Sequence, residues 1–151
     1  MAILEEWIVP EAITDQLAER EKQILGAALP GNFECRVEYD DARIVVILVA
    51  QLEQLARLAE LLDKPLGVFE GWDWEDEIEE LEEGDSYLVE VELQQKVPET
   101  VARGESERPV LSVYSKDANN NEAWPIAFIL AARLASELGA IEAEAWPKVL
   151  N

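Results

Sequence analysis

The sequence predicts a single-domain α+β fold in which a mixed or antiparallel sheet packs against three main helices. Three observations support this prediction. The chain has 151 residues, which fits one domain of ordinary size with its own core. Its composition is 49% hydrophobic and 30% charged, as is typical of a globular protein. Segments of period-2 alternation and segments of helical period follow one another, so that both strands and helices are expected.

The first third of the chain predicts a helix followed by a β-hairpin. Pro10 suits a first helical turn, and apolar residues on one face predict a helix over residues 10–29. Residues 33–39 alternate between apolar and polar types, which indicates a half-buried strand. Residues 44–50 are continuously apolar and rich in β-branched types, which favours a central strand buried on both faces. Two aspartates between these strands favour a turn, so we expect a hairpin.

The middle of the chain predicts a second helix and two strands. Apolar residues recur at helical spacing over residues 51–63, and Pro65 prevents the helix from continuing. Residues 66–70 suit a short strand. Residues 87–93 alternate between apolar residues and glutamates, which predicts a strand with one buried face.

The last third predicts a strand, a central helix and a final strand. Residues 110–114 suit the partner of strand 87–93, and the polar residues 94–109 between them predict a long loop. A helix is expected over residues 122–138, ended by Gly139, and residues 141–146 follow as a strand.

A short internal echo predicts tandem β-β-α-β units. The residues A-R-L-A occur at 56–59 and again at 132–135, and each copy follows a predicted hairpin and precedes a strand-like segment that ends in tryptophan. Half-repeats over 32–72 and 86–146 would then be joined by an acidic helix over 73–83. Because four residues of common types carry the echo, a single domain without duplication is the alternative.

The net charge of the chain is −21, and more than half of it lies in one segment. Residues 70–92 hold 12 acids and no base, whereas residues 1–69 hold 13 acids and 6 bases and residues 93–151 hold 8 acids and 6 bases. Binding to a phosphate backbone depends on Lys and Arg, so nucleic acid and anionic membranes are not expected as partners. A basic protein or a cation is the expected partner.

The acidic segment predicts an amphipathic helix over residues 73–83. Trp74, Ile78 and Leu81 would form its apolar stripe, and carboxylates would cover the remaining surface. Such a surface can steer a basic partner and then anchor it through an exposed tryptophan. The predicted docking residues are Trp72, Asp73, Glu75, Asp76, Glu79, Glu80 and Glu83, and we refer to them as the acidic ridge.

Two alternatives remain for this segment. Like-charge runs are often solvated connectors without a partner. A calcium loop is the second alternative, because Asp73, Glu75 and Glu77 occupy its first, third and fifth positions. The pattern then fails, since Ile78 stands where glycine is needed and Gly84 where glutamate is needed. No metal or cofactor is predicted.

The sequence lacks the residues of most catalytic sites. It has no histidine, which excludes histidine-based acid–base catalysis, the usual triads and His-ligated zinc. Cys35 lies in an apolar alternation and is interpreted as a small buried hydrophobe. A Mg²⁺-dependent hydrolase that uses only carboxylates remains an alternative. Its candidate groups Glu34, Glu38, Glu90 and Glu92 are expected to face solvent on the polar sides of strands.

The chain is expected to be cytoplasmic and to work by binding. A single cysteine allows no internal disulfide, no signal peptide is recognised, and the longest uncharged apolar run, residues 123–132, is too short to cross a bilayer. The predicted function is that of a non-enzymatic acidic protein that docks a positively charged protein, as an immunity protein, an inhibitor or a DNA mimic does. A subunit of a homo-oligomer is a further alternative.

Overall fold

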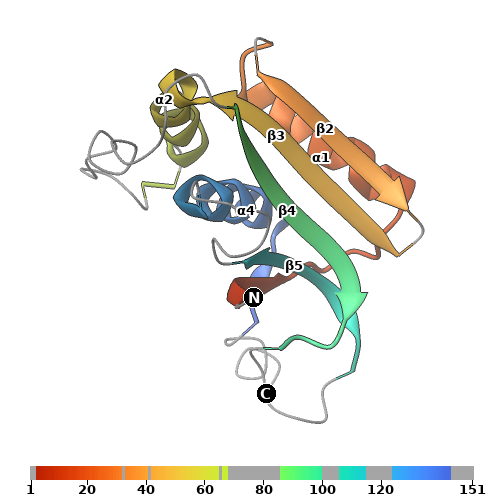
Figure 1. The fold of residues 1–151 in the computed structure, drawn as a ribbon. Helices are drawn as coiled ribbons and strands as arrows, with labels where there is room; N and C mark the ends of the chain where they lie inside the picture. Colours follow the sequence, from red (N-terminus) through yellow and green to blue (C-terminus); the bar gives the residue numbers. More distant parts are fainter. Residues whose placement is uncertain are drawn as a thin grey trace.

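The protein is a single α+β domain built on one antiparallel sheet. The computed structural model describes residues 3–31, 33–40, 42–64, 66–67, 86–99, 106–114 and 124–143. Within these ranges there are three helices and one six-stranded sheet (Figure 1). The predicted fold class is therefore confirmed, and the sheet is antiparallel rather than mixed.

The strand order of the sheet places the first strand between the last two. The strands are β1 (Ile3–Ile8), β2 (Glu34–Asp40), β3 (Arg43–Gln51), β4 (Ser86–Lys96), β5 (Arg108–Tyr114) and β6 (Ile141–Glu142). They are hydrogen-bonded in the order β2-β3-β4-β5-β1-β6, and every neighbouring pair is antiparallel. The predicted hairpin of β2 with β3 and the pairing of β4 with β5 are both confirmed.

The helices are α1 (Asp15–Ala28), α2 (Leu52–Asp63) and α4 (Trp124–Leu138). In Figure 1, α1 lies behind β2 and β3, and α4 lies beside β4 with α2 next to it. Helix α4 contacts β4, β5, β1 and both other helices, which makes it the central helix, as the sequence predicts.

The core lies between the helices and one face of the sheet. Alternate residues of β3, from Ile44 to Ala50, point into it and are buried, as expected for a pleated strand. On its opposite face β3 is partly covered, with Val45 buried. Strand β3 is therefore an interior strand, one position in from the edge strand β2, with its inner face buried as predicted and its outer face only partly buried.

The helix boundaries follow local capping chemistry. Helix α1 begins at Asp15 because Thr14 is its N-cap, with the threonine Oγ1 accepting a hydrogen bond from the Leu17 amide at 3.3 Å. The predicted start at Pro10 was therefore wrong. Helix α4 ends as predicted at Gly139, whose φ of 70° is the left-handed conformation that glycine adopts readily.

Strand β1 was not predicted. Its sequence I-L-E-E-W-I does not alternate, because two adjacent glutamates occupy its middle. Trp7 packs in the core, and its ring meets that of Phe128 edge-on with the centroids 5.7 Å apart.

Three predicted boundaries change because strand pairing continues or stops at other residues. The loop predicted over 94–109 is shorter, since β4 continues to Lys96 and β5 begins opposite it at Arg108. Leu66 and Gly67 do not form a strand, because their amides donate to the Asp63 carbonyl in a turn after α2. The final strand is described only over Ile141–Glu142.

The tandem β-β-α-β units stay a prediction. The described elements follow the order β2-β3-α2 and then β4-β5-α4, which matches the first three elements of each predicted unit. The acidic helix predicted over 73–83 lies outside the described residues. Among the helices that the structure describes, none combines the length and the apolarity that a bilayer crossing needs.

Candidate functional site

The acidic ridge lies entirely outside the described residues, so its docking role stays a prediction. The ridge belongs to the connection between α2, which ends at Asp63, and β4, which begins at Ser86. Two properties of the described residues are relevant to the predicted ridge. One is how many of their cations already pair with carboxylates, and the other is which binding surfaces they form.

Most described cations are already neutralised by nearby carboxylates. Of the nine Lys and Arg side chains in the described ranges, seven form an ion pair: Arg20, Lys22, Arg36, Arg43, Arg57, Lys96 and Arg133. Each of these seven cations pairs with a carboxylate that is itself among the described residues. Most of the described Lys and Arg side chains therefore form ion pairs with described Asp and Glu side chains.

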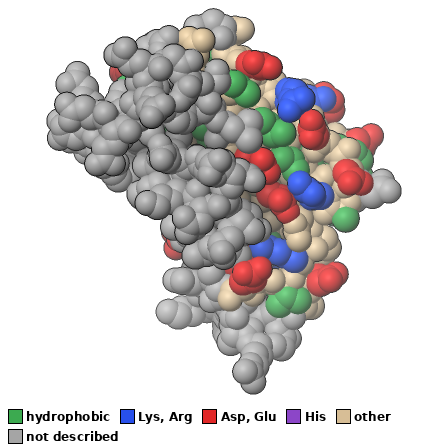
Figure 2. Space-filling model, in the orientation of Figure 1, with side chains coloured by type: hydrophobic (Ala, Val, Ile, Leu, Met, Phe, Trp, Pro, Cys, Tyr) green, Lys and Arg blue, Asp and Glu red, His purple; other side chains and the backbone are tan. Residues whose placement is uncertain are grey.

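The outer face of the sheet, opposite the helices, carries mixed charge. Acidic and basic side chains are interspersed on the surface that Figure 2 shows, over the strands at the right of that view. The Arg43 Nε lies 3.6 Å from the Glu92 carboxylate. Glu34 and Glu38 are exposed as predicted, whereas Glu90 and Glu92 are half-buried. No group of three metal-ligating side chains occurs among the described residues.

A buried ion pair joins β1 to β4 on this outer face. The Lys96 Nζ lies 3.0 Å from the Glu6 carboxylate, whose side chain is fully buried, while that of Lys96 is 12% exposed. Ser112, which is opposite Glu6 in the β1–β5 register, is buried too. Because a buried charge is costly without a partner, Lys96 explains how a glutamate is accommodated inside the sheet. We interpret this pair as structural.

A second buried carboxylate, Glu21, lies on the inner face of α1. It shares this face with Leu17, Ala18 and Leu25, and it is 0% exposed. Neither carboxylate oxygen has a hydrogen-bond partner among the described residues. Burial raises the pKa of the Glu21 carboxyl from about 4.5 to about 7, because an apolar environment disfavours the charged form.

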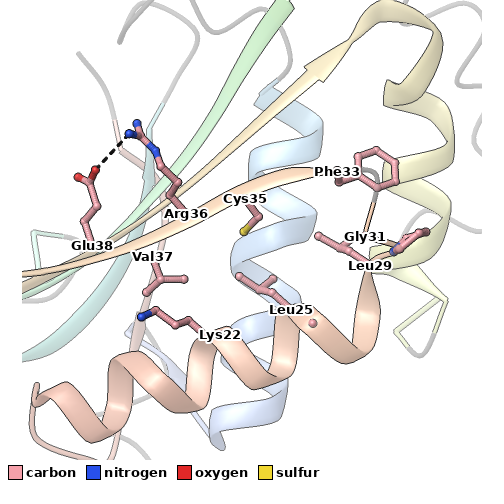
Figure 3. Close-up of a pocket in the computed structure, with 11 residues that line it drawn as sticks. Lys22, Leu25, Leu29, Gly31, Phe33, Cys35, Arg36, Val37 and Glu38 are labelled. Carbon is pink, nitrogen blue, oxygen red and sulfur yellow. Dashed lines mark ion pairs between the residues drawn. The ribbon is translucent and has the colours of Figure 1, made fainter.

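A groove lies between α1 and β2 in the described part of the chain. Its volume is about 540 Å³. In Figure 3, Cys35 and Val37 point from β2 toward α1, and Leu25 points back toward β2. Leu29 and Phe33 line the same groove at one end. The floor is therefore apolar and is shared by one helix and one strand.

Charged residues border this groove. Lys22 lies at its α1 side, and Arg36 and Glu38 point away from the floor on the other side of β2 (Figure 3). Both cations are engaged: the Lys22 Nζ lies 3.0 Å from the Glu19 carboxylate, and the Arg36 guanidinium lies 3.7 Å from that of Glu38.

Cys35 is half-buried in the floor and is a poor nucleophile. Burial raises the pKa of its thiol to about 11, so that little thiolate is present at neutral pH. The interpretation of Cys35 as a small hydrophobe holds, although its side chain is only partly covered.

The sequence predictions did not include the groove. The alternation over residues 33–39 indicates that one side of β2 is apolar, and the α1 pattern indicates a matching face. Neither pattern indicates that β2 is the edge of the sheet, because that position depends on the pairing order of all six strands. The positions of β1, β5 and β6 at the other side of the sheet leave β2 with β3 as its one described neighbour.

Comparison of the chain with protein-family models, with curated proteins and with solved structures finds no significant match in any of the three.

Proposed function

We propose that this protein is a non-enzymatic acidic binding protein that docks a positively charged protein partner in the cytoplasm. The acidic ridge, Trp72 with Asp73, Glu75, Asp76, Glu79, Glu80 and Glu83, supplies the negative potential. Immunity proteins, inhibitors and DNA mimics belong to this class, because each presents carboxylates to a surface that normally accepts a polyanion or that is itself basic.

The observation that carries the proposal is the distribution of charge. The chain has a net charge of −21, and at least seven of the nine described cations pair with carboxylates of the described residues. The 12 acids of residues 70–92 have no base in their own segment. An external cationic surface would relieve this repulsion, and it would be steered to the protein by the long-range field.

The test compares two variants that lose the same amount of negative charge at different places. The ridge variant carries Glu75→Gln, Asp76→Asn, Glu79→Gln and Glu80→Gln. The matched control carries glutamine at Glu11, Glu60, Glu107 and Glu142, which are exposed and lie outside the ridge. Exposed ion pairs contribute little to stability, so both variants are expected to fold.

Each form is immobilised and used to capture proteins from the native cell lysate. The proposal expects a basic protein that wild type and control retain, that the ridge variant loses, and that moderate salt releases. Elution by double-stranded DNA would identify the subclass that occupies a polyanion site. Equal capture by the ridge variant and the control would remove the ridge from the mechanism.

A further inference from the structure

Strand β2 is an edge strand whose outer side carries no described strand. It is seven residues long, Glu34–Asp40, and pairs with β3 in an uninterrupted register. An edge strand presents backbone N–H and C=O groups that can pair with another extended chain. Its geometry is therefore that of a template for one more strand.

Two of the usual structural protections of an edge strand, a proline and a β-bulge, are missing from β2. Its side chains on the α1 side include no charge: Cys35 and Val37 are half-buried, and Tyr39 is 41% exposed. Only the charges on the opposite side of the strand limit what can pair with it.

The groove provides space for the side chains of an added strand. Successive side chains of a strand point to opposite faces, so every second residue of an added strand would point toward α1. Leu29, which directly follows α1, and Phe33, which precedes β2, are half-buried apolar side chains at one end of this volume of about 540 Å³, and the buried Leu25 of α1 also lines it. Apolar side chains at alternate positions of the added strand match this surface.

The charges on the face of β2 that points away from α1 determine which side chains suit the other alternate positions of the added strand. This side presents Glu34, Arg36, Glu38 and Asp40, all exposed, which gives three acids and one base. Side chains directly opposite one another across two strands interact, and opposite charges are favourable there. Arg36 already lies near Glu38. An added strand with Lys or Arg at its outward positions is therefore complementary.

A second copy of this chain fits the edge less well. An antiparallel pairing centred on Val37 would set Glu34 of each copy against Asp40 of the other, and the two Arg36–Glu38 pairs of the same register would only offset this repulsion. A pairing centred on Arg36 would set Arg36 against itself and Glu34 against Glu38. In both registers like charges face one another, and two chains of −21 each would be brought together.

We propose that β2 and the α1–β2 groove bind an extended segment of the cationic partner, in which basic and apolar residues alternate, as an added strand of the sheet. This inference rests on the proposed function for the positive charge of the partner. The inference specifies the site at which an extended segment of that partner binds and the sequence pattern of that segment.

The test uses three synthetic peptides at about 0.15 M salt, where long-range attraction is screened. The first alternates lysine with valine over nine residues. The second alternates lysine with serine and has the same charge without apolar side chains. The third is the lysine–valine peptide with every second backbone nitrogen methylated. It is made in two versions, one for each of the two sets of alternate nitrogens. We expect the first to bind at least tenfold more tightly than the second, and we expect one methylated version to lose binding because its donors face β2.

Two variants with equal charge changes locate the peptide. Tyr39→Lys places a cation on β2 itself, at an exposed position that directly follows the groove-lining residues Val37 and Glu38, and Gln23→Lys places one at an exposed site of α1 that does not line the groove. We expect Tyr39→Lys to weaken the lysine–valine peptide about tenfold and Gln23→Lys to change its affinity less than twofold. Amide hydrogen exchange should slow in β2 when the peptide is added, a readout that does not depend on any variant.

Several outcomes would overturn the inference. These are equal affinity for the lysine–valine and lysine–serine peptides, no binding of either, or no added exchange protection in β2. A dimer in sedimentation that Tyr39→Lys dissociates would instead identify a second copy as the occupant. If the peptide responds to the ridge variant and not to Tyr39→Lys, the β2 site fails while the proposed function stands. If lysate capture does not depend on the ridge, the proposed function itself fails, whatever the peptides show.

Discussion

The two ends of the sheet differ in how completely helices cover them. At the α4 end, β4, β5 and β1 pack against a helix whose inward residues, from Ile126 to Leu138, are almost all buried. At the α1 end, the corresponding side chains of β2 are half-buried, and a groove separates the helix from the strand. Most of the packing energy is therefore expected from the α4 end. The α1 end keeps apolar surface that is only partly buried and that a partner could cover.

Helix α1 also carries two features that lower its own stability. Glu21 occupies its buried face without a hydrogen-bond partner among the described residues, and Gly26 lies in its final turns. A buried unpaired carboxylate and a helical glycine each cost stability. The comparison therefore predicts that α1 can be strengthened by single substitutions, whereas α4 can only be weakened.

The largest expected effect compares core truncations at the two ends. Leu130→Ala removes a fully buried side chain of α4 and should lower the free energy of unfolding by about 3 kcal/mol. Val37→Ala removes a half-buried side chain at the groove and should cost about 1 kcal/mol. Urea unfolding of both variants measures the difference. Equal losses would show that the α1 end is as tightly packed as the α4 end.

The next effect is a pH-dependent gain from Glu21→Gln. Because the folded-state pKa of Glu21 is raised from about 4.5 to about 7, the native state holds this proton more tightly than the unfolded chain. The cost of Glu21 is therefore absent below about pH 4.5, grows as the pH rises to 7, and is complete above it. Glu21→Gln should stabilise the protein by about 2 kcal/mol at pH 8 and hardly at all at pH 4.

The measurement is urea unfolding of Glu21→Gln and wild type across this pH range, with Glu19→Gln as an exposed control on the same helix. General charge repulsion also changes with pH, and the control removes that contribution. A gain that is independent of pH would mean that folding does not change the pKa of the Glu21 carboxyl.

The smallest effect compares alanine substitutions at two glycines that both have open space where a methyl group would stand. A Cβ at Gly26 or at Gly139 would meet no atom within 4 Å, so only the backbone decides the outcome. Gly26→Ala should stabilise by about 0.5 to 1 kcal/mol through helix propensity. Gly139→Ala should destabilise by about 1 kcal/mol, because its φ of 70° disfavours a side chain. Thermal melting of both variants should shift in opposite directions.

Local sequence patterns predicted the parts of the fold that local chemistry controls. The strands β2, β3, β4 and β5 follow from alternation or from a continuous apolar run, and Gly139 marks the end of α4. The start of α1 was misplaced because Pro10 suits a helix but Thr14 provides the cap.

Long-range pairing controls the parts that could not be predicted. The glutamates of β1 hide its strand character in the sequence, and the ion pair of Glu6 with Lys96, ninety positions away, helps to account for the burial of Glu6. The candidate groove likewise depends on β2 being an edge, which no local pattern encodes. The acidic ridge is predicted from the sequence alone, since a run of charged residues can be recognised without knowledge of the fold.

The insertion of β1 between β5 and β6 has a consequence for how the chain folds during its synthesis. Ile8 pairs with Val110 and Ile141, so β1 is synthesised about a hundred residues before either of the described strands that pair with it. Closing so long a loop is entropically expensive, and a high contact order slows folding. The β2–β3 hairpin and β4 can pair earlier, and β1 would then be among the last strands to join the sheet.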